Sequence, residues 1–168
     1  MKYAVKMYSN EITPALVAFL KHPHTPEEWA AMDDDSRAFW TLEAEKMAPR
    51  TLEEFWRLAS EGSLTREGGR VEQGNSELEI TLDTGKKVRL AQVGDTVLYP
   101  DGTRARIISG TGDAGTFGGG SFALVGSLLD NGDEIICTPQ NVVTLVRWDN
   151  SEPFPANFLK PEVLDAAL

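Results

Sequence analysis

The side chains of this sequence that could carry out chemistry are few and far apart. Its two histidines, His22 and His24, lie two positions apart, and the single cysteine, Cys137, follows more than a hundred residues later. A catalytic nucleophile needs a base beside it, and nothing in the sequence predicts that Cys137 meets either histidine. Cys137 closes an apolar run that begins at Ile135, so we predict a small buried residue there.

Metal binding by His22 and His24 would require further ligands. Structural zinc sites take four, from cysteine, histidine or carboxylate side chains at short, regular spacings. No such spacing surrounds the segment 22–24. We therefore predict no metal site on it.

The carboxylates of the second half could pair as catalytic acids or bind calcium. The candidates are Asp95, Asp101, Asp113, Asp130 and Asp133. Almost all lie beside a glycine, where aspartate is typical of tight turns, and we predict turn roles for them. The run from Gly110 to Gly120 has the glycine content of a phosphate-binding loop but lacks its Gly-Lys-Ser/Thr ending. It is predicted to be a flexible insertion, and no catalytic residue is predicted anywhere, so we do not expect an enzyme.

Length and composition restrict the class of protein. The 168 residues, of which 41% are hydrophobic, suit one full domain or a domain with a substantial appendage. A net charge of −10 argues against binding to nucleic acid, which requires clustered Lys and Arg. The N-terminal region is too polar for a signal peptide, and its longest apolar run, 15–20, is too short for a bilayer. We expect a soluble protein without a membrane-spanning segment.

Residues 1–62 are predicted to form a helical N-terminal extension. Thr25 suits an N-cap, Pro26 the first helical position and Glu28 a capping box. A near-copy of this pattern at Thr51 predicts another helix, which Gly62 would end.

Two further helices are expected in the same extension. The acidic residues at 33–35 suit the first turn of a helix over 37–47. A shorter helix is expected over 13–20.

The extension is rich in large aromatic side chains. The candidates for a partner-binding face are Trp29, Phe39, Trp40, Phe55 and Trp56. Clustered aromatics are typical of binding surfaces. The same residues could instead form the core of a small helical unit, and the sequence leaves both interpretations open.

From Ser63 the pattern changes to short alternating apolar runs that are cut by turn dipeptides. Three hairpins are predicted: 77–82 with 87–90, 96–99 with 103–108 about Asp101-Gly102, and 122–129 with 133–137 about Asn131-Gly132. A further strand is expected over 142–148. The segments 93–95 (VGD) and 125–127 (VGS) occupy corresponding places and indicate a weak internal repeat.

The predicted fold class is α+β, with a helical extension (1–62), a small all-β domain of three hairpins (63–148) and a C-terminal tail (149–168). The tail is punctuated by proline and is expected to be extended. Phe154, Phe158 and Leu159 are expected to tie it to the rest of the protein. Residues 162–168 could add a last helical turn.

The β-type region resembles a known family through a series of segments in one order. They are Leu64–Gly74 (LTREGGRVEQG), Val93–Val97 (VGDTV), Tyr99–Gly102 (YPDG), Arg106–Gly110 (RIISG), Phe122–Ser127 (FALVGS) and Asn131–Ile135 (NGDEI). This succession resembles the PAAR-repeat proteins, which form the tips of type VI secretion and related contractile injection spikes. The resemblance covers residues 63–140. It implies a small PAAR-like cone of β-hairpins with pseudo-threefold form.

The family's zinc site is not matched. Its members hold zinc near the apex with three histidines and a cysteine, but Glu67 stands in place of the first of these histidines. The segment Tyr99–Gly102 has neither the usual cysteine nor the usual histidine, and no histidine follows His24. We expect no zinc, and an apex held by packing and hydrogen bonds.

The resemblance implies a structural protein that caps a trimeric VgrG-type spike, one copy per trimer. Such a protein would reside in the bacterial cytoplasm and then be secreted into a target cell without a signal peptide. The helical extension would carry or recruit an effector or a chaperone. An acidic module that occupies a partner toxin's site, as an immunity protein does, is the alternative, and a secreted toxin enzyme is a more distant one.

Overall fold

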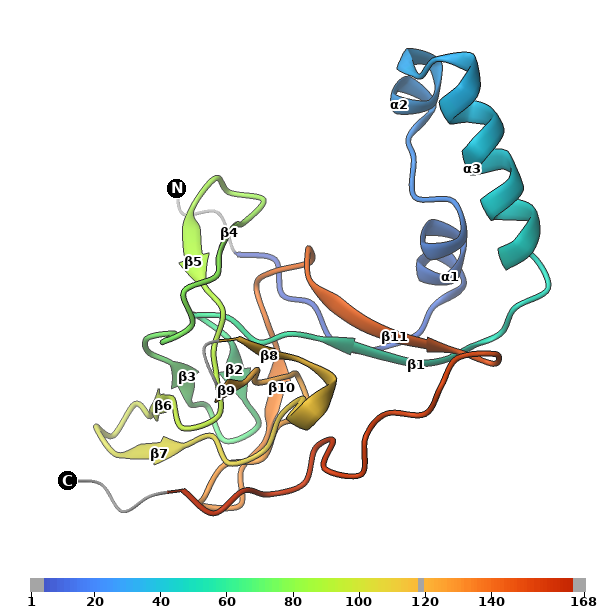
Figure 1. The fold of residues 1–168 in the computed structure, drawn as a ribbon. Helices are drawn as coiled ribbons and strands as arrows, with labels where there is room; N and C mark the ends of the chain where they lie inside the picture. Colours follow the sequence, from blue (N-terminus) through green and yellow to red (C-terminus); the bar gives the residue numbers. More distant parts are fainter. Residues whose placement is uncertain (1–4, 118–119, 165–168) are drawn as a thin grey trace. The chain divides into compact units, whose positions relative to one another are not determined.

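The computed structural model describes residues 5–117 and 120–164 (Figure 1). The chain forms two compact units. One consists of Met1–Asn10, Trp56–Leu145 and Pro153–Leu168, and we call it the body. The other consists of Glu11–Phe55 and Val146–Glu152, and we call it the helical unit. The described elements are a few helices and many short antiparallel strands, which agrees with the predicted α+β class.

The first two helices were both predicted, and the second begins at the capping signal predicted for it. α1 spans Pro14–Lys21, and the hydroxyl of its N-cap Thr13 accepts a backbone N–H bond of 3.1 Å. α2 spans Pro26–Ala31. Its capping box is complete, because Thr25 and Glu28 each accept a backbone N–H bond of 3.0 Å from the other. These bonds satisfy N–H groups that a helix start leaves without partners.

α3 spans Asp34–Met47 and starts three residues earlier than predicted. Asp33 is its N-cap and accepts a bond of 2.7 Å from the backbone N–H of Ser36. None of the residues in α1, α2 or α3 is buried. The helices are therefore specified by signals at their ends more than by a core beneath them.

The helix predicted to start at Thr51 is wrong. Residues Leu52–Arg57 form a strand, β1, which pairs with β11 at Thr144–Trp148. The carbonyl of Thr51 accepts a bond of 2.9 Å from the N–H of Asp149, so the local capping pattern is overridden by a distant strand partner. The strand predicted over 142–148 is confirmed.

The body contains the remaining strands. A five-stranded sheet has the order β10–β2–β3–β6–β7, with β2 at Leu64–Thr65, β3 at Arg70–Val71, β6 at Thr96–Leu98, β7 at Arg104–Arg106 and β10 at Ile135–Cys137. Two separate ribbons pair β4 (Glu79–Thr81) with β5 (Lys87–Arg89) and β8 (Thr116–Phe117) with β9 (Gly120–Ser121). A 3-10 turn, η1, covers Gly112–Ala114.

The first two predicted hairpins are confirmed, and the third is confirmed in part. β4 pairs with β5, and β6 pairs with β7. In the third, Leu128 bridges Glu134 across the Asn131-Gly132 turn, but β10 continues into a pairing with β2. The hairpin of β2 and β3 was not predicted, because its two-residue strands are too short to show alternation.

Three repeats spaced 32 residues apart organise the body. They are Leu58–Thr65 (LASEGSLT), Leu90–Val97 (LAQVGDTV) and Phe122–Leu129 (FALVGSLL), and we call them modules 1, 2 and 3. The second residue of each is a fully buried alanine. Ala59 donates its N–H to the carbonyl of Ala123, Ala123 to Ala91, and Ala91 to Ala59, each at 2.9 Å. These bonds close a ring that joins each module to the other two.

The backbone leaves the ring in the same way in each module. Gly62, Gly94 and Gly126 have φ angles of 89°, 97° and 108°, which favour glycine. Their N–H groups donate to the carbonyls of Val71, Ile107 and Ile135 at 3.0, 2.7 and 2.8 Å. The side chain that follows each glycine accepts a bond from the backbone N–H three positions earlier. These side chains are Ser63, Asp95 and Ser127, and the distances are 3.0, 2.8 and 2.8 Å. The three modules are thus equivalent in hydrogen bonding as well as in sequence.

The core of the body has two parts. One cluster contains the three ring alanines with Val71, Val97, Ile107, Leu129 and Ile135, all nearly inaccessible to solvent. The other contains Leu58, Leu90 and Phe122, the residues immediately before the ring alanines, together with Leu124. Corresponding residues of the three modules therefore pack against one another in both clusters.

The prediction that 110–120 is a flexible insertion is wrong for the part that the structure describes. Gly110 is buried, and a Cβ there would lie 2.1 Å from the carbonyl oxygen of Phe122, so glycine permits a close approach of two backbones. Thr111 exchanges bonds with Phe122: its N–H donates to the Phe122 carbonyl at 2.9 Å, and its hydroxyl accepts the Phe122 N–H at 3.0 Å. The run continues into η1 and the β8–β9 ribbon.

The C-terminal tail packs on the body as predicted. Phe158 and Leu159 contact the second core cluster, and Phe154 stacks on Phe158 with ring centres 4.3 Å apart. The N–H of Leu159 donates to the carbonyl of Gly110 at 2.8 Å. Residues 162–164 are not helical, and the rest of the predicted last turn lies outside the described residues.

Candidate functional site

The ends of the β2–β3 hairpin, of the β6–β7 hairpin and of the hairpin that leads into β10 bring polar side chains together. We call Thr65, Tyr99, Asn131 and Asp133 the tip cluster. The hydroxyl of Tyr99 donates to the Asp133 carboxylate at 2.5 Å and accepts a bond of 3.0 Å from the side-chain amide of Asn131. The hydroxyl of Thr65 also hydrogen-bonds to Asp133. Thr65, Tyr99 and Asp133 are 3%, 9% and 4% exposed, so this is a buried polar network.

The Asp133 carboxylate is satisfied on both oxygens. Besides its two hydroxyl donors, it accepts backbone N–H bonds from Glu67 at 3.2 Å and Glu134 at 2.8 Å. Burial raises the pKa of Asp133, but the bonds from Thr65, Tyr99 and the two N–H groups outweigh it and hold the pKa below its usual range. Burial, followed by the bond to Asp133, raises the pKa of Tyr99.

The other aspartates of the body also have structural roles. Asp95 is 3% exposed and accepts bonds from the backbone N–H groups of Asn75 and Gln92 at 3.0 and 2.8 Å. Asp101 bonds to Thr103 across its turn, as predicted. Asp95 joins two segments and therefore does more than form a local turn.

The residue types of a zinc site are not assembled in the described parts of the chain. Within 5–117 and 120–164, no group of three His, Cys, Asp or Glu side chains lies close enough to share a metal ion. Cys137 is half-buried rather than buried, and burial raises the pKa of its thiol, which favours the unreactive form. No described helix has the length and apolar character needed to cross a bilayer.

The structure separates the five predicted partner-binding aromatics. Trp29 belongs to α2, Phe39 and Trp40 to α3, and Phe55 and Trp56 to β1. Phe55 is 4% exposed, and Trp56 packs edge to face on Phe158 with ring centres 5.4 Å apart. Of the helical aromatics, Phe39 is exposed, and Trp29 and Trp40 are partly buried.

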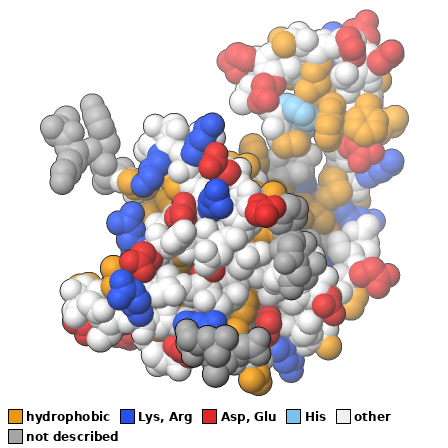
Figure 2. Space-filling view, turned by 60° about the vertical axis from the view of Figure 1, so that its left-hand side comes forward, with side chains coloured by type: hydrophobic (Ala, Val, Ile, Leu, Met, Phe, Trp, Pro, Cys, Tyr) orange, Lys and Arg blue, Asp and Glu red, His pale blue; other side chains and the backbone are white. Residues whose placement is uncertain are grey.

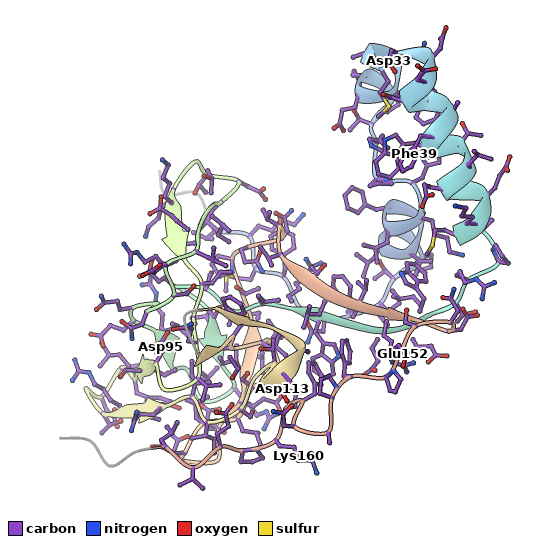
Figure 3. The ribbon with its side chains drawn as sticks, in the orientation of Figure 1. Asp33, Phe39, Asp95, Asp113, Glu152 and Lys160 are labelled. Atoms are coloured by element: carbon purple, nitrogen blue, oxygen red, sulfur yellow. The ribbon has the colours of Figure 1, made fainter. Side chains whose placement is uncertain are left out.

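The helical aromatics gather around the two histidines, and we call His22, His24, Trp29, Phe39 and Trp40 the aromatic cluster. The ring of His24 lies 4.6 Å from Trp40, His22 lies 5.4 Å from Trp29, and Phe39 lies 5.1 Å from Trp40. Phe39 is 54% exposed, and Phe19 and Leu42, elsewhere in the same unit, are 59% and 58% exposed. Figure 2 shows hydrophobic side chains beside a histidine on this unit, and Figure 3 marks Phe39 on α3.

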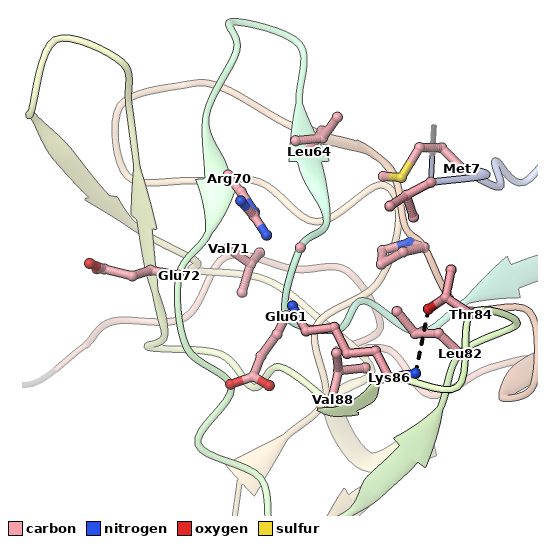
Figure 4. A pocket seen from close by; sticks show the side chains of 13 residues that line it. Met7, Glu61, Leu64, Arg70, Val71, Glu72, Leu82, Thr84, Lys86 and Val88 are labelled. Carbon is pink, nitrogen blue, oxygen red and sulfur yellow. Dashed lines mark hydrogen bonds between the residues drawn. The ribbon is translucent and has the colours of Figure 1, made fainter. Parts of the chain in front are cut away.

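The body also carries a groove of about 550 Å³ (Figure 4). Its lining is mixed: Met7, Leu64 and Val88 are apolar, and Arg70 and Lys86 are basic. Glu61 also lines it, but its carboxylate accepts backbone N–H bonds from Gly74 and Arg89 at 3.1 and 2.9 Å. A second carboxylate of the lining, that of Glu72, pairs with Arg104 at 3.3 Å, so the groove offers a mixed apolar and charged surface.

Two features of the site were missed from the sequence. The repeat was noticed only at 93–95 and 125–127, although Glu61-Gly62-Ser63 is its third copy 32 residues earlier. The tip cluster was missed as well, because residue types alone do not show that Tyr99 and Asp133, from different hairpins, meet. A systematic comparison of the sequence with itself at a spacing of 32 would have found the first.

Comparisons of the chain with protein-family models, with curated proteins and with solved structures find no match.

Proposed function

We propose that this protein is a structural, non-enzymatic tip of a contractile injection spike of the type VI kind. In this proposal the body is a PAAR-like cone that caps a trimeric VgrG-type spike, one copy per trimer. The protein would assemble in the bacterial cytoplasm and leave the cell on the spike. The sequence resemblance over 63–140 suggests this role, and the ring of three equivalent modules is the observation that carries it.

The ring supports the proposal because it places threefold repetition within one chain. A trimer presents the same surface three times around its axis, and a single chain can meet all three only if its own contacts repeat in a similar way. The hydrogen bonds among Ala59, Ala91 and Ala123 supply that repetition. A monomer without internal repeats could contact the three subunits only unequally.

The ribbons are the elements that we expect to contact the spike. The strands β1, β5 and β9 lead into modules 1, 2 and 3, and each belongs to a separate two-stranded sheet. An edge strand can pair with strands of a partner. In the β4–β5 ribbon the N–H groups of Leu82 and Leu90 donate to the opposite strand. Hydrogen-bonded pairs alternate along an antiparallel ladder, so Ile80 and Val88 form the next such pair. The N–H of Thr81, which lies between two such pairs, therefore points away from β5.

The helical unit would recruit an effector or a chaperone. It carries twelve carboxylates against five basic side chains, and its exposed apolar residues include Phe19, Phe39 and Leu42. Exposed apolar residues on a unit of net negative charge suit a partner that presents apolar residues among basic ones.

The stoichiometry of the spike complex tests the proposal. The full chain, co-expressed with a trimeric VgrG-type protein, is expected to give a complex of one copy per trimer by native mass spectrometry. Thr81→Pro should weaken that complex by removing one edge N–H while the ribbon's own bonds remain, and Thr81→Ala is the matched control. Three copies per trimer, or no complex with the spike, would contradict the proposal. Tight binding to a basic toxin instead would favour the immunity alternative.

A further inference from the structure

We infer that the tip cluster is a hydrogen-bonded clasp that closes the three hairpin ends against one another without a metal ion. This inference concerns the folded body alone and does not depend on the proposed function. It extends the expectation of an apex held by hydrogen bonds by assigning that role to particular side chains.

The clasp takes one buried group from each hairpin. Thr65 belongs to the β2–β3 hairpin, Tyr99 to the β6–β7 hairpin, and Asp133 to the hairpin that leads into β10. The two hydroxyls both bond to the one carboxylate. Asp133 is therefore the hub, and losing it would leave each of the other two hairpin ends without its bond to the third.

The modules are specialised for these contacts. Thr65, Tyr99 and Leu129 hold the same place in their hairpins, since each donates its N–H to the carbonyl four residues later at 2.9 Å. Of the three, the two that bond to Asp133 have a hydroxyl and the third is apolar. Gly69 allows the approach: a Cβ there would lie 2.9 Å from both the Thr65 hydroxyl oxygen and the Tyr99 ring. The N–H of Gly69 donates to the Thr65 hydroxyl at 2.8 Å, which orients it.

The donor set does not fit zinc. Zinc in a structural site prefers thiolate and imidazole ligands, whereas the clasp consists of two hydroxyls, an amide and one carboxylate. The lone pairs of Asp133 are already used by two hydroxyls and two backbone N–H groups. A metal ion at this place would have to displace these bonds and would find no nitrogen or sulfur ligand in exchange.

The surface offers a matched pair for comparison. The hydroxyl of Tyr8 donates to Asp83 at 2.5 Å, the same chemistry as Tyr99 with Asp133, but this pair lies at the surface. Exposed pairs contribute little to stability because water competes for both partners. The two pairs therefore separate the effect of the bond from the effect of its burial.

A double-mutant cycle on the full chain tests the clasp. Tyr99→Phe and Asp133→Asn are expected each to lower the folding equilibrium constant about tenfold or more. The loss in the double variant should be clearly smaller than the two losses combined, because one change removes the hydroxyl donor and the other the charge of the acceptor in the same bond. The cycle of Tyr8→Phe with Asp83→Asn should show losses of about twofold or less.

Chelation tests the absence of a metal. The melting temperature should be the same with and without EDTA, and added zinc should not raise it. The inference is overturned if EDTA lowers the melting temperature, if zinc co-purifies at one ion per chain, or if the Tyr99–Asp133 losses are simply additive. If Asp133→Asn fails to fold, the cycle of Thr65→Val with Tyr99→Phe replaces it. We expect the losses from these two changes to be coupled through Asp133. Strictly additive losses would contradict the clasp.

Discussion

The body and the helical unit are stabilised in opposite ways. Seventeen of the nineteen buried hydrophobic side chains in the described residues belong to the body, whereas the three helices of the other unit contain none. The body is joined by hydrogen bonds between residues tens of positions apart, such as Ala59 with Ala123. The helices are bounded by bonds within three or four residues, such as Thr25 with Glu28. The difference shows that one chain can combine a closely packed scaffold with a lightly packed helical face.

The largest difference between the units should appear when a buried side chain is shortened. Ile107 is inaccessible to solvent in the body core, and Ile107→Ala is expected to lower the free energy of unfolding by about 2–5 kcal/mol. Phe39→Ala in the helical unit should change it by about 0.5 kcal/mol, because Phe39 is half exposed. Urea unfolding followed by circular dichroism measures both. Equal losses would mean that the two units share one core.

A smaller effect is expected where a backbone approach is blocked. Gly110→Ala places a Cβ against the Phe122 carbonyl and should cost about 1–3 kcal/mol. Gly115→Ala, five residues later in the same glycine-rich run, meets atoms only at 3.7 Å or beyond and should cost little. Thermal unfolding of the two variants compares them. If both are neutral, the run is not packed as the structure has it.

A cap in the helical unit should matter less, and only locally. Thr25→Ala removes both the N-cap and the capping box and should cost about 1 kcal/mol of helix stability. The signal at 222 nm should fall slightly while the cooperative unfolding of the body is unchanged. Thr25→Ser keeps the hydroxyl and serves as the control. A shift of the main unfolding transition would show that α2 is coupled to the body.

The smallest effect is expected when acid protonates Asp133, a buried residue of the body. The pKa of Asp133 is lower in the folded body than in the unfolded chain, where it is about 3.9. Its stabilisation is therefore fully present above pH of about 4 and is lost as the pH falls through the folded-state pKa. Tyr99 stays protonated throughout this range. Urea unfolding at pH 7, 5 and 3 gives the free energy of unfolding of the protein and of Asp133→Asn. The difference between the two should shrink at pH 3. A difference that stays constant would show that protonation of Asp133 does not affect stability in this range.

The elements that could be predicted from the sequence were those with a local cause. Asp101-Gly102 and the capping box at Thr25 act within four residues, and both were identified correctly. The pattern at Thr51 has the same local form but becomes a strand, because β11 pairs with it almost a hundred residues later. Local signals cannot report a partner at that distance.

The candidate sites were less predictable because they depend on which segments meet. The predicted aromatic set divides between the units: Trp29, Phe39 and Trp40 lie in α2 and α3, while Trp56 packs on Phe158. The tip cluster combines residues from three hairpins whose meeting is fixed only by the ring. The glycine-rich run was also misjudged, because its order comes from contacts with Phe122 and Asn157.

The ring of alanines also sets the order in which this chain can mature on the ribosome. Ala59 cannot donate to Ala123, nor β1 pair with β11, until the segments around 123 and 144–148 have been made. Domains fold as units once their whole sequence is available. The apolar residues of modules 1 and 2 therefore stay exposed to solvent until module 3 has been synthesised. The helices, which need only neighbours in sequence, can form early. Modules 1 and 2, by contrast, lack their common partner until module 3 has been made.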